Sequence, residues 1–186
     1  MAQQRVCPWW LGYFLASPIR RLWCAPGTLV EPHLKAGMTV LEPGPGMGFF
    51  TIEIARLVGT DGRVVAVDIE SKMLDVLKRR AAKAGVAHQI DARVCAADSM
   101  GLTDLAGQVD FVLACAVVHE LPSPSAFFQE AAQTMKTGAA LLFIEPSGHV
   151  TNPEFDRELE LAAGAGLAVV ERPSIRRSHA ALLQKS

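Results

Sequence analysis

Three acidic residues each stand at the end of a short apolar run, where a carboxylate could bind a polar ligand. Glu42 opens a glycine-rich segment that extends to Gly48, and Asp68 and Asp98 follow the next two apolar runs. In open α/β sheets, ligands bind outside the carboxyl ends of the parallel strands. Taken singly, each acid is an ordinary charge at a strand end. The ordered set of three predicts a shared ligand site, with all three carboxylates along one edge of a sheet.

The segment after Glu42 reads Pro-Gly-Pro-Gly-Met-Gly over residues 43–48 and leads from an expected strand into an expected helix. Glycine lets the backbone approach a ligand closely, and a helix N-terminus presents unpaired amide groups. A tight turn without a ligand is the alternative. Pro43 and Pro45 have no amide proton, which compromises any cradle of successive backbone donors for phosphate groups. The loop therefore favours a ligand that lacks phosphates.

From residue 38 onward, apolar runs alternate with segments of helical periodicity, which predicts a parallel sheet flanked by helices. The expected strands are residues 39–42, 64–68, 92–96, 109–114, 140–145, 167–171 and 179–184. The expected helices are residues 49–58, 71–84, 123–135 and 153–163, with a less regular turn around 100–105. Ser71 and Ser123 are the expected helix caps, and Gly85 and residues 164–166 the expected helix ends.

The last two expected strands are joined only by residues 172–178, a connection shorter than a parallel crossover requires. They must therefore pair as an antiparallel hairpin. The predicted fold class is α/β: a Rossmann-like three-layer sandwich with a seven-stranded, mostly parallel sheet and an antiparallel last strand.

The composition of the 186-residue chain, 50% hydrophobic and 20% charged, is that of a packed α/β protein. The net charge is -1 and no long basic run is present, so we expect no nucleic-acid partner. The four cysteines lack CxxC spacing, and the apolar run at residues 9–16 is too short to cross a bilayer. We therefore expect a cytoplasmic protein without a transmembrane segment.

Together, these motifs resemble those of class I S-adenosylmethionine-dependent methyltransferases, over roughly residues 35–185. Residues 67–74, the strand at 109–111 and the His-Glu-Leu at 119–121 look like the ubiquinone/menaquinone C-methyltransferase group in particular. The resemblance implies S-adenosyl-L-methionine as the cofactor. The residues that it implies for cofactor binding are Glu42, Pro43, Gly44, Pro45, Gly46, Asp68, Ile69, Met73, Asp98, Ser99, Ala114 and Cys115.

By the same resemblance, each part of the cofactor has its own partners. Glu42 and the glycine loop would hold the methionine part, helped by backbone contacts from the end of the fourth strand. Asp68 would hold the ribose, and Asp98 with Ser99 would frame the adenine.

His119 is the leading candidate for a general base, because imidazole titrates near neutral pH and can remove a proton from an acceptor. The alternative is that His119 packs beside the cofactor or caps a turn. Glu120, Glu145 and His149 are weaker candidates for the same role. Sequence spacing alone does not bring the histidines and a cysteine together, so we expect no bound metal.

The acceptor is expected to be a small molecule. Enzymes that methylate amino groups on nucleobases resemble one another in an Asn/Asp-Pro-Pro-aromatic motif after the fourth strand, whereas this chain has Ala-Cys-Ala-Val at residues 114–117. Two other functions stay open: a module that binds S-adenosylmethionine without turnover, and a nicotinamide-dependent oxidoreductase. The oxidoreductase is disfavoured because Phe49 stands where the G-x-G-x-x-G fingerprint requires a small residue.

Two domains are expected: residues 1–36 as an N-terminal lid or packing segment, and residues 37–186 as the methyltransferase domain. The Trp-rich residues 7–14 would shield a pocket from water. The short core leaves little room for an inserted specificity domain. The acceptor must then be recognised by the N-terminal segment, by the strand-end loops or by a second subunit. A homodimer is therefore among the expected assemblies.

Overall fold

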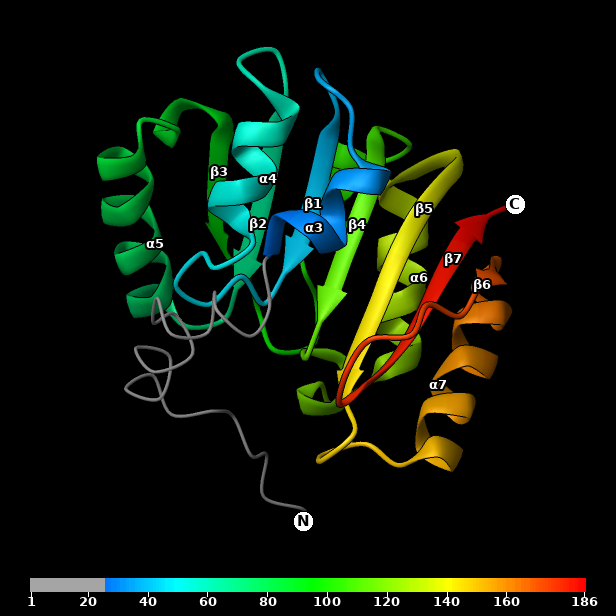
Figure 1. The fold of residues 1–186 in the computed structure, drawn as a ribbon. Helices are drawn as coiled ribbons and strands as arrows, with labels where there is room; N and C mark the ends of the chain where they lie inside the picture. The colour runs from blue at the N-terminus through cyan, green and yellow to red at the C-terminus, as the bar shows by residue number, and fades with distance from the viewer. Residues whose placement is uncertain (1–25) are drawn as a thin grey trace. The chain divides into compact units, whose positions relative to one another are not determined.

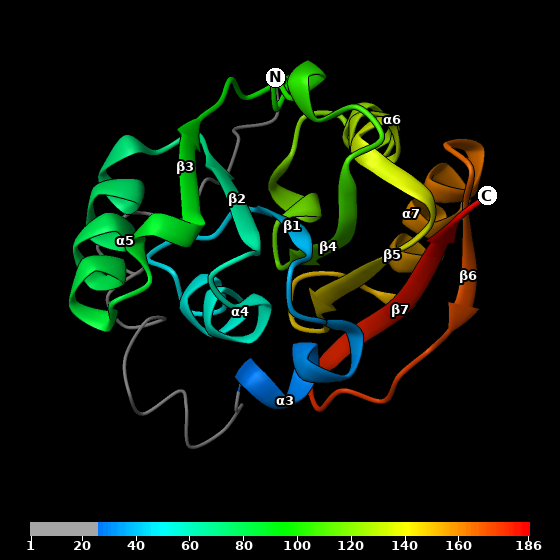
Figure 2. The same ribbon diagram turned by 90° about the horizontal axis from the view of Figure 1, so that it is seen from above.

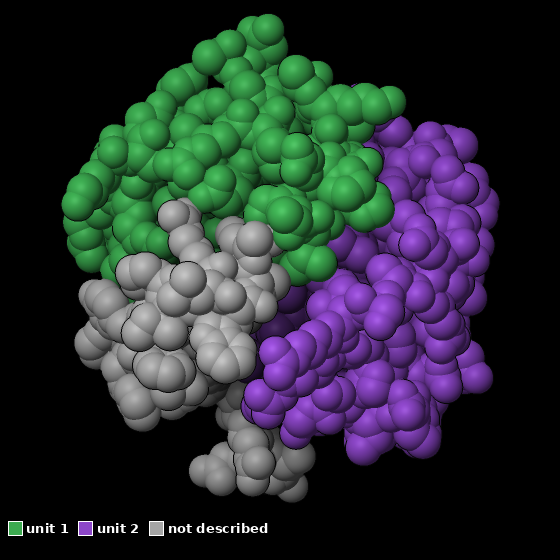
Figure 3. All heavy atoms as spheres, viewed as in Figure 1, with its two compact units in different colours: residues 1–95 green, residues 96–186 purple. Residues whose placement is uncertain are grey.

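The structure, a computed structural model, describes residues 26–186. Contacts within the chain divide it into two compact units, residues 1–95 and residues 96–186 (Figure 3). Most of the expected N-terminal lid lies outside the described residues. None of the helices that the structure describes combines the length and the apolar character needed to cross a membrane.

The first unit contains a three-stranded parallel sheet in the order β3-β2-β1 (Figure 1). Its elements are α3 (Pro26–Val30), η1 (Glu31–His33), β1 (Thr39–Pro43), α4 (Thr51–Val58), β2 (Arg63–Asp68), α5 (Ser71–Ala84), η2 (Ala87–Gln89) and β3 (Ile90–Val94). Strand β2 is buried from Val64 to Val67, the continuous apolar pattern of a parallel strand covered on both faces. The register pairs Glu42 with Ala66 and Asp68 with Val94, so β1 and β2 end close together.

Helices α4 and α5 lie side by side against this sheet, α4 on β2 and α5 on β3 (Figure 2). Helix α5 has the predicted bounds and ends at Gly85, which adopts the left-handed conformation with φ 74°. The predicted cap, Ser71, is wrong. The cap is Glu70, whose side chain accepts from the Lys72 amide, because the Asp68 carboxylate already fixes the Glu70 amide and makes Glu70 the extended residue before the helix.

The second unit contains four strands in the order β4-β5-β7-β6. Its elements are η3 (Thr103–Leu105), β4 (Val109–Cys115), η4 (Val118–Glu120), α6 (Pro124–Thr134), β5 (Met135–Pro146), α7 (Asn152–Gly164), β6 (Leu167–Glu171) and β7 (Ser178–Lys185). Strands β4 and β5 are parallel, and β7 is antiparallel to both of its neighbours, β5 and β6. The predicted terminal hairpin is confirmed, and β7 is inserted between β5 and β6 (Figure 1).

An aromatic row joins the helices of the second unit to its sheet. Phe128 of α6 contacts Phe143 of β5 edge to face at 5.4 Å between ring centroids, and Phe143 stacks on Phe155 of α7 at 4.9 Å. Such pairs add to the stabilisation from burial itself. Ser123 caps α6 as predicted, because its side chain accepts from the Ala126 amide.

Several predicted bounds shift by a few residues. Strand β3 begins at Ile90 and ends at Val94, two residues before the predicted span, because Asp91 and Arg93 interrupt the apolar run that the prediction followed. Helix α4 begins at Thr51, two residues later than predicted. Helix α7 extends to Gly164, and the left-handed glycine after it is Gly166.

Candidate active site

Glu42 is a buried carboxylic acid in the second-last position of β1, with only 3% of its surface exposed. Its Oε2 atom has no hydrogen-bond partner, and neither has the hydroxyl of Thr51. The pKa of Glu42 is raised to about 7, mainly by burial and to a smaller extent by the charge of Asp68, although Thr51 opposes the increase. A buried oxygen without a donor is costly, so this side chain is suited to an incoming N–H group.

Asp68 ends β2 and connects it to the glycine loop. Its Oδ2 accepts from the Gly46 amide at 3.3 Å, and its Oδ1 accepts from the Glu70 amide at 2.9 Å. Burial raises the pKa of this carboxyl, and the backbone amides partly offset the increase. The structure therefore brings together Glu42, Asp68 and the loop between them, as predicted.

The other predicted cofactor residues of the first unit surround this pair. Gly44 donates its amide to the Val67 carbonyl at 2.9 Å, which seats the loop against β2. Pro43 and Pro45 are buried, and Gly44 is exposed. Ile69 follows Asp68 with 42% of its surface exposed, whereas Met73 in the first turn of α5 is buried.

Asp98 and Ser99 are exposed and belong to the second unit. Their turn is closed by a hydrogen bond from the Ala96 amide to the Ser99 carbonyl at 3.2 Å. The next residue, Met100, donates its amide to Glu130 of α6 at 2.7 Å, which anchors the turn. The convergence of Asp98 with Glu42 and Asp68 stays a prediction.

The end of β4 changes direction sharply. Ala114 is buried and Cys115 half-buried, and Ala116 then adopts a positive φ of 56°. A left-handed alanine costs about 1–2 kcal/mol, and such strain is often found at functional sites. The Ala116 amide donates to the Ile144 carbonyl of β5 at 2.8 Å, so the turn that leads to His119 is held against the neighbouring strand.

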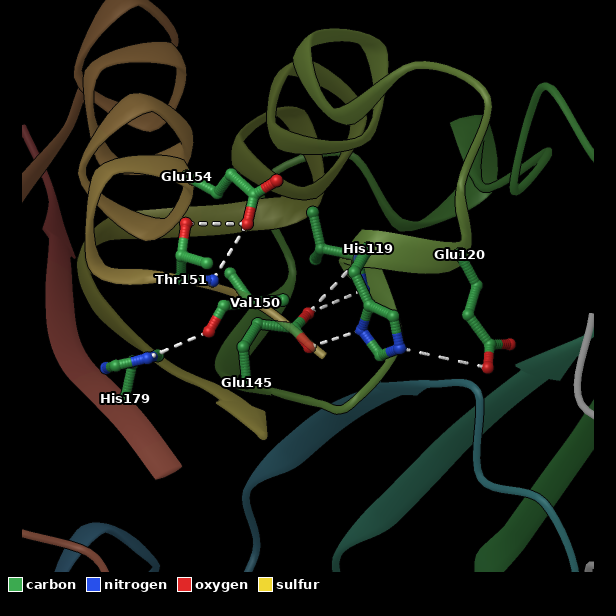
Figure 4. A network of polar contacts seen from close by, with 8 residues as sticks. His119, Glu120, Glu145, Val150, Thr151, Glu154 and His179 are labelled. Atoms are coloured by element: carbon green, nitrogen blue, oxygen red, sulfur yellow. Dashed lines mark hydrogen bonds and ion pairs between the residues drawn. The ribbon is translucent and has the colours of Figure 1, made fainter. Parts of the chain in front are cut away.

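A network of hydrogen bonds and ion pairs joins this turn to β5 (Figure 4). Glu145 is fully buried, and its Oε1 accepts from the amides of Val118 at 2.8 Å and His119 at 3.3 Å. Its Oε2 lies 2.5 Å from Nδ1 of the His119 ring. Both carboxylate oxygens therefore have donors, as a buried charge requires.

Three more ionisable groups lie near the His119 ring. Glu120 places Oε1 3.9 Å from Nε2, and the His149 ring lies 5.4 Å away, centroid to centroid. The Glu145 hydrogen bond is the largest influence on His119 and raises its pKa above 6.5, although burial opposes it. Burial and the Glu145 charge raise the pKa of Glu158, on α7, to about 7.

Glu158 is a site residue that the sequence reasoning missed. It shares the inner face of α7 with Phe155, Leu159 and Ala162, and its Oε2 has no hydrogen-bond partner. A single acid among apolar residues at helical spacing is the signal that would have revealed it. Within residues 26–186, no group of three or more His, Cys, Asp or Glu side chains is arranged to hold a metal ion.

The loop after β5, which carries His149, is fixed at two points. His179 of β7 donates Nε2–H to the Val150 carbonyl at 3.0 Å (Figure 4), and the Ser147 amide donates to the Arg177 carbonyl at 3.1 Å. Thr151 then begins α7, with its amide donating to Glu154 at 2.8 Å. The antiparallel strand β7 thus supports the same cluster that β4 and β5 supply.

The family model described as a methyltransferase domain matches residues 34–171. The chain is similar to the ubiquinone/menaquinone biosynthesis C-methyltransferase UbiE of Marinomonas sp. (strain MWYL1), with 25% identity over 77% of this chain and 57% of that protein. The UbiE protein of Hahella chejuensis is 26% identical over 84% of this chain and 61% of that protein. The chain thus spans less than two thirds of the length of these relatives.

Among solved structures, a SAM-dependent methyltransferase from Aquifex aeolicus matches with a TM-score of 0.87 and 22% identity, over 97% of this chain and all of that one. This likeness confirms the predicted Rossmann-like α/β fold class, with seven strands, mostly parallel, and an antiparallel last strand. The family match over residues 34–171 covers well over half of the chain. The chain therefore belongs to the methyltransferase domain family, within the class I S-adenosylmethionine-dependent methyltransferases.

Proposed function

We propose that this chain transfers a methyl group from S-adenosyl-L-methionine to a small-molecule acceptor. The observation that carries the proposal is the buried carboxyl of Glu42, whose Oε2 lacks a partner at the edge of the sheet where Asp68 also ends its strand. Two carboxyls at successive strand ends suit a ligand that brings several donors, such as an amino group and ribose hydroxyls.

The residues of the first unit fit this cofactor. Glu42 would hold the amino group of the methionine part, because its buried oxygen lacks a donor that an ammonium group supplies. Asp68 would hold the ribose, and the exposed side chain of Ile69 would lie against the adenosine. The prolines of the loop leave few amides for phosphate groups, and this cofactor has none. In the second unit, Asp98 with Ser99 would frame the adenine.

When bound, the cofactor supplies a methyl group already activated on a sulfonium, so the protein mainly has to align the acceptor, exclude water and remove a proton. Alignment of this kind can lower the activation free energy by up to roughly 7 to 11 kcal/mol. His119 is the proposed general base, because its ring is part-buried in η4, just after β4, with Nδ1 held by Glu145. Glu120, 3.9 Å from Nε2, would accept the proton on its way to water.

A small acceptor is supported by the absence of a basic run in the sequence and by the sequence that follows the fourth strand. In the proposed domain arrangement, residues 1–36 act as an N-terminal lid or packing segment and residues 37–186 form the methyltransferase domain. A homodimer and a cytoplasmic location are part of the same proposal. Deletion of residues 1–16 tests the lid: turnover falls while the core stays folded if the segment is a lid, and folding is lost if it only packs.

The direct test of function is incubation of the purified chain with methyl-labelled S-adenosylmethionine and a fraction of small metabolites. A labelled product that appears with the wild type and is lost with Asp68→Asn supports the proposal. Asp75→Asn is the matched control, because Asp75 is an exposed acid of α5 outside the site. Binding of the labelled cofactor without any product would instead favour a non-catalytic module.

A further inference from the structure

Glu145 stands out because its side chain is fully buried and its carboxylate makes its hydrogen bonds, within residues 26–186, to the segment that carries His119. A buried carboxylate in a strand needs compensation for its lost hydration. Here three donors provide it: the Val118 amide, the His119 amide and the His119 ring. Both amides donate to Oε1, so Oε2 depends on the His119 ring for its donor. The third bond fixes an imidazole ring, which is a functional group.

We propose that Glu145 is a positioning residue for His119: it holds the ring proton on Nδ1, so that Nε2 is the atom that removes a proton from the acceptor. This inference rests on the proposed function. An ionised carboxylate only accepts hydrogen bonds, so the ring nitrogen that lies 2.5 Å from it must be the one that donates. In a neutral ring, the remaining nitrogen, Nε2, then carries the lone pair.

The pair formed by Glu145 and His119 also narrows the chemical class of the acceptor. In the proposed step a proton of the acceptor group passes to Nε2, and the electron pair that held it stays on the acceptor atom, which uses it to form the bond to the transferred methyl group. The imidazolium that forms is stabilised by Glu145, as the carboxylate of a catalytic triad stabilises its histidine. A thioether or any other acceptor without a removable proton gains nothing from this arrangement. The acceptor is therefore a group with a removable proton, such as a hydroxyl, an amine, a thiol or an activated C–H, and not a thioether.

The charges around the ring come from each element that packs against it. Glu145 on β5 acts on Nδ1, Glu120 on η4 lies near Nε2, and Glu158 on α7 adds a third acid. His149, in the loop after β5, is the other imidazole near the ring. Among residues 26–186, Glu145 is the one residue that makes a hydrogen bond to the ring. Its replacement therefore removes the positioning contact while Glu120 and Glu158 keep their negative charges near the ring.

The experiment is long-range ¹H–¹⁵N NMR of the wild type and of Glu145→Gln, with the His119 signals assigned through His119→Gln. The wild type is expected to hold its neutral His119 as the Nδ1–H form, with a pKa above 6.5. In Glu145→Gln the His119 pKa should fall and the two neutral forms should mix. Glu160→Gln is the matched control, since it removes an exposed acid of α7 and should change neither property.

If the neutral His119 ring of the wild type carries its proton on Nε2, the proposal is wrong. The wild-type spectrum alone shows this, without any variant. An unchanged His119 pKa and proton position in folded Glu145→Gln would overturn it as well. Glu145→Asp, which keeps the charge on a shorter side chain, is expected to restore the pKa in part. None of these measurements depends on turnover. They therefore test the role of Glu145 independently of the methyltransferase assignment.

The acceptor class has its own test. Once an acceptor is identified by labelling, the methylated atom is expected to be one that loses a proton in the reaction, and a sulfonium formed from a thioether would contradict the inference while leaving the methyltransferase assignment intact. In Glu145→Gln we expect kcat to fall about 10-fold to 100-fold, a part of what a general base contributes, with little change in KM. A change in KM alone would assign Glu145 to acceptor binding instead.

Discussion

The carboxylate of Asp68 accepts a hydrogen bond from the backbone amide of Gly46 over 3.3 Å. This bond joins the end of β2 to the loop that follows β1, and Gly46 adopts a positive φ of 53° where it forms. A glycine reaches this conformation without the penalty of a side chain. The loop is therefore held in place before any ligand arrives, which lowers the entropic cost of binding.

Removal of the Glu42 charge should stabilise the folded protein at alkaline pH. The pKa of Glu42 is about 7 in the folded state and 4.5 for an ordinary glutamate, so the folded state holds this proton more tightly than the unfolded chain does. The wild type then loses stability as the pH rises from about 4.5 through 7, up to roughly 3 kcal/mol for this group. Glu42→Gln should lack this loss.

Urea unfolding of both proteins at pH 5 and at pH 8 measures the effect. The free energy of unfolding of Glu42→Gln, relative to the wild type, should increase between the two pH values. Glu31→Gln, which removes an exposed acid of the same unit, should follow the wild type. A difference between Glu42→Gln and the wild type that is independent of pH would show that the Glu42 pKa is not raised.

Glycine 48 should tolerate substitution less well than another glycine of similar conformation. Gly48 has φ 81°, and a Cβ added there would lie 2.3 Å from Cδ1 of Leu77 on α5. Gly85 has φ 74°, with nothing within 4 Å of an added Cβ. Both substitutions by alanine incur backbone strain, but Gly48→Ala also displaces a buried leucine, a change that costs about 1–3 kcal/mol.

Thermal and urea unfolding of Gly48→Ala and Gly85→Ala compare the two directly. If Gly48→Ala lowers the free energy of unfolding more than Gly85→Ala does, the difference measures how closely α5 approaches the loop. Equal losses would mean that the Leu77 side chain moves aside without cost, and that the loop does not need a glycine at this position for packing.

The rate of methyl transfer should rise with pH through the His119 pKa. A general base has to be neutral, and Glu145 raises the pKa of His119 above 6.5, so the protonated, inactive form persists to higher pH than for a free histidine. His119→Ala should lose about 10²–10⁴-fold in kcat and the pH dependence as well. The exposed His88 supplies the control, His88→Ala. A His119→Ala enzyme with the wild-type pH profile would exclude His119 as the base.

Much of the fold follows from local patterns. The runs that became β1, β2 and β4 are almost entirely apolar, and the short connection at residues 172–178 leaves only an antiparallel pairing for β6 and β7. Strand β3 was placed less well because Asp91 lies between Arg63 of β2 and Arg93 of its own strand, an ion-pair network that the apolar pattern does not reveal.

The site was predicted in part. The positions of Glu42 and Asp68 could be predicted because both residues stand at the carboxyl ends of neighbouring parallel strands, which share one edge of the sheet. The bond between Glu145 and His119 joins residues 26 positions apart in the sequence, through a turn that depends on the left-handed Ala116. No propensity predicts such an alanine. Glu158 lies on α7, which packs against α6 and β6, and these tertiary contacts are not specified by sequence periodicity.

Calorimetric titration measures whether the acids at the strand ends bind S-adenosylmethionine. The wild type and Asp75→Asn should bind the cofactor with equal affinity, while Asp68→Asn should bind about 10-fold to 100-fold more weakly through loss of charge-assisted hydrogen bonds. Tighter binding of a nicotinamide dinucleotide, or an affinity for S-adenosylmethionine that Asp68→Asn leaves unchanged, would contradict the account.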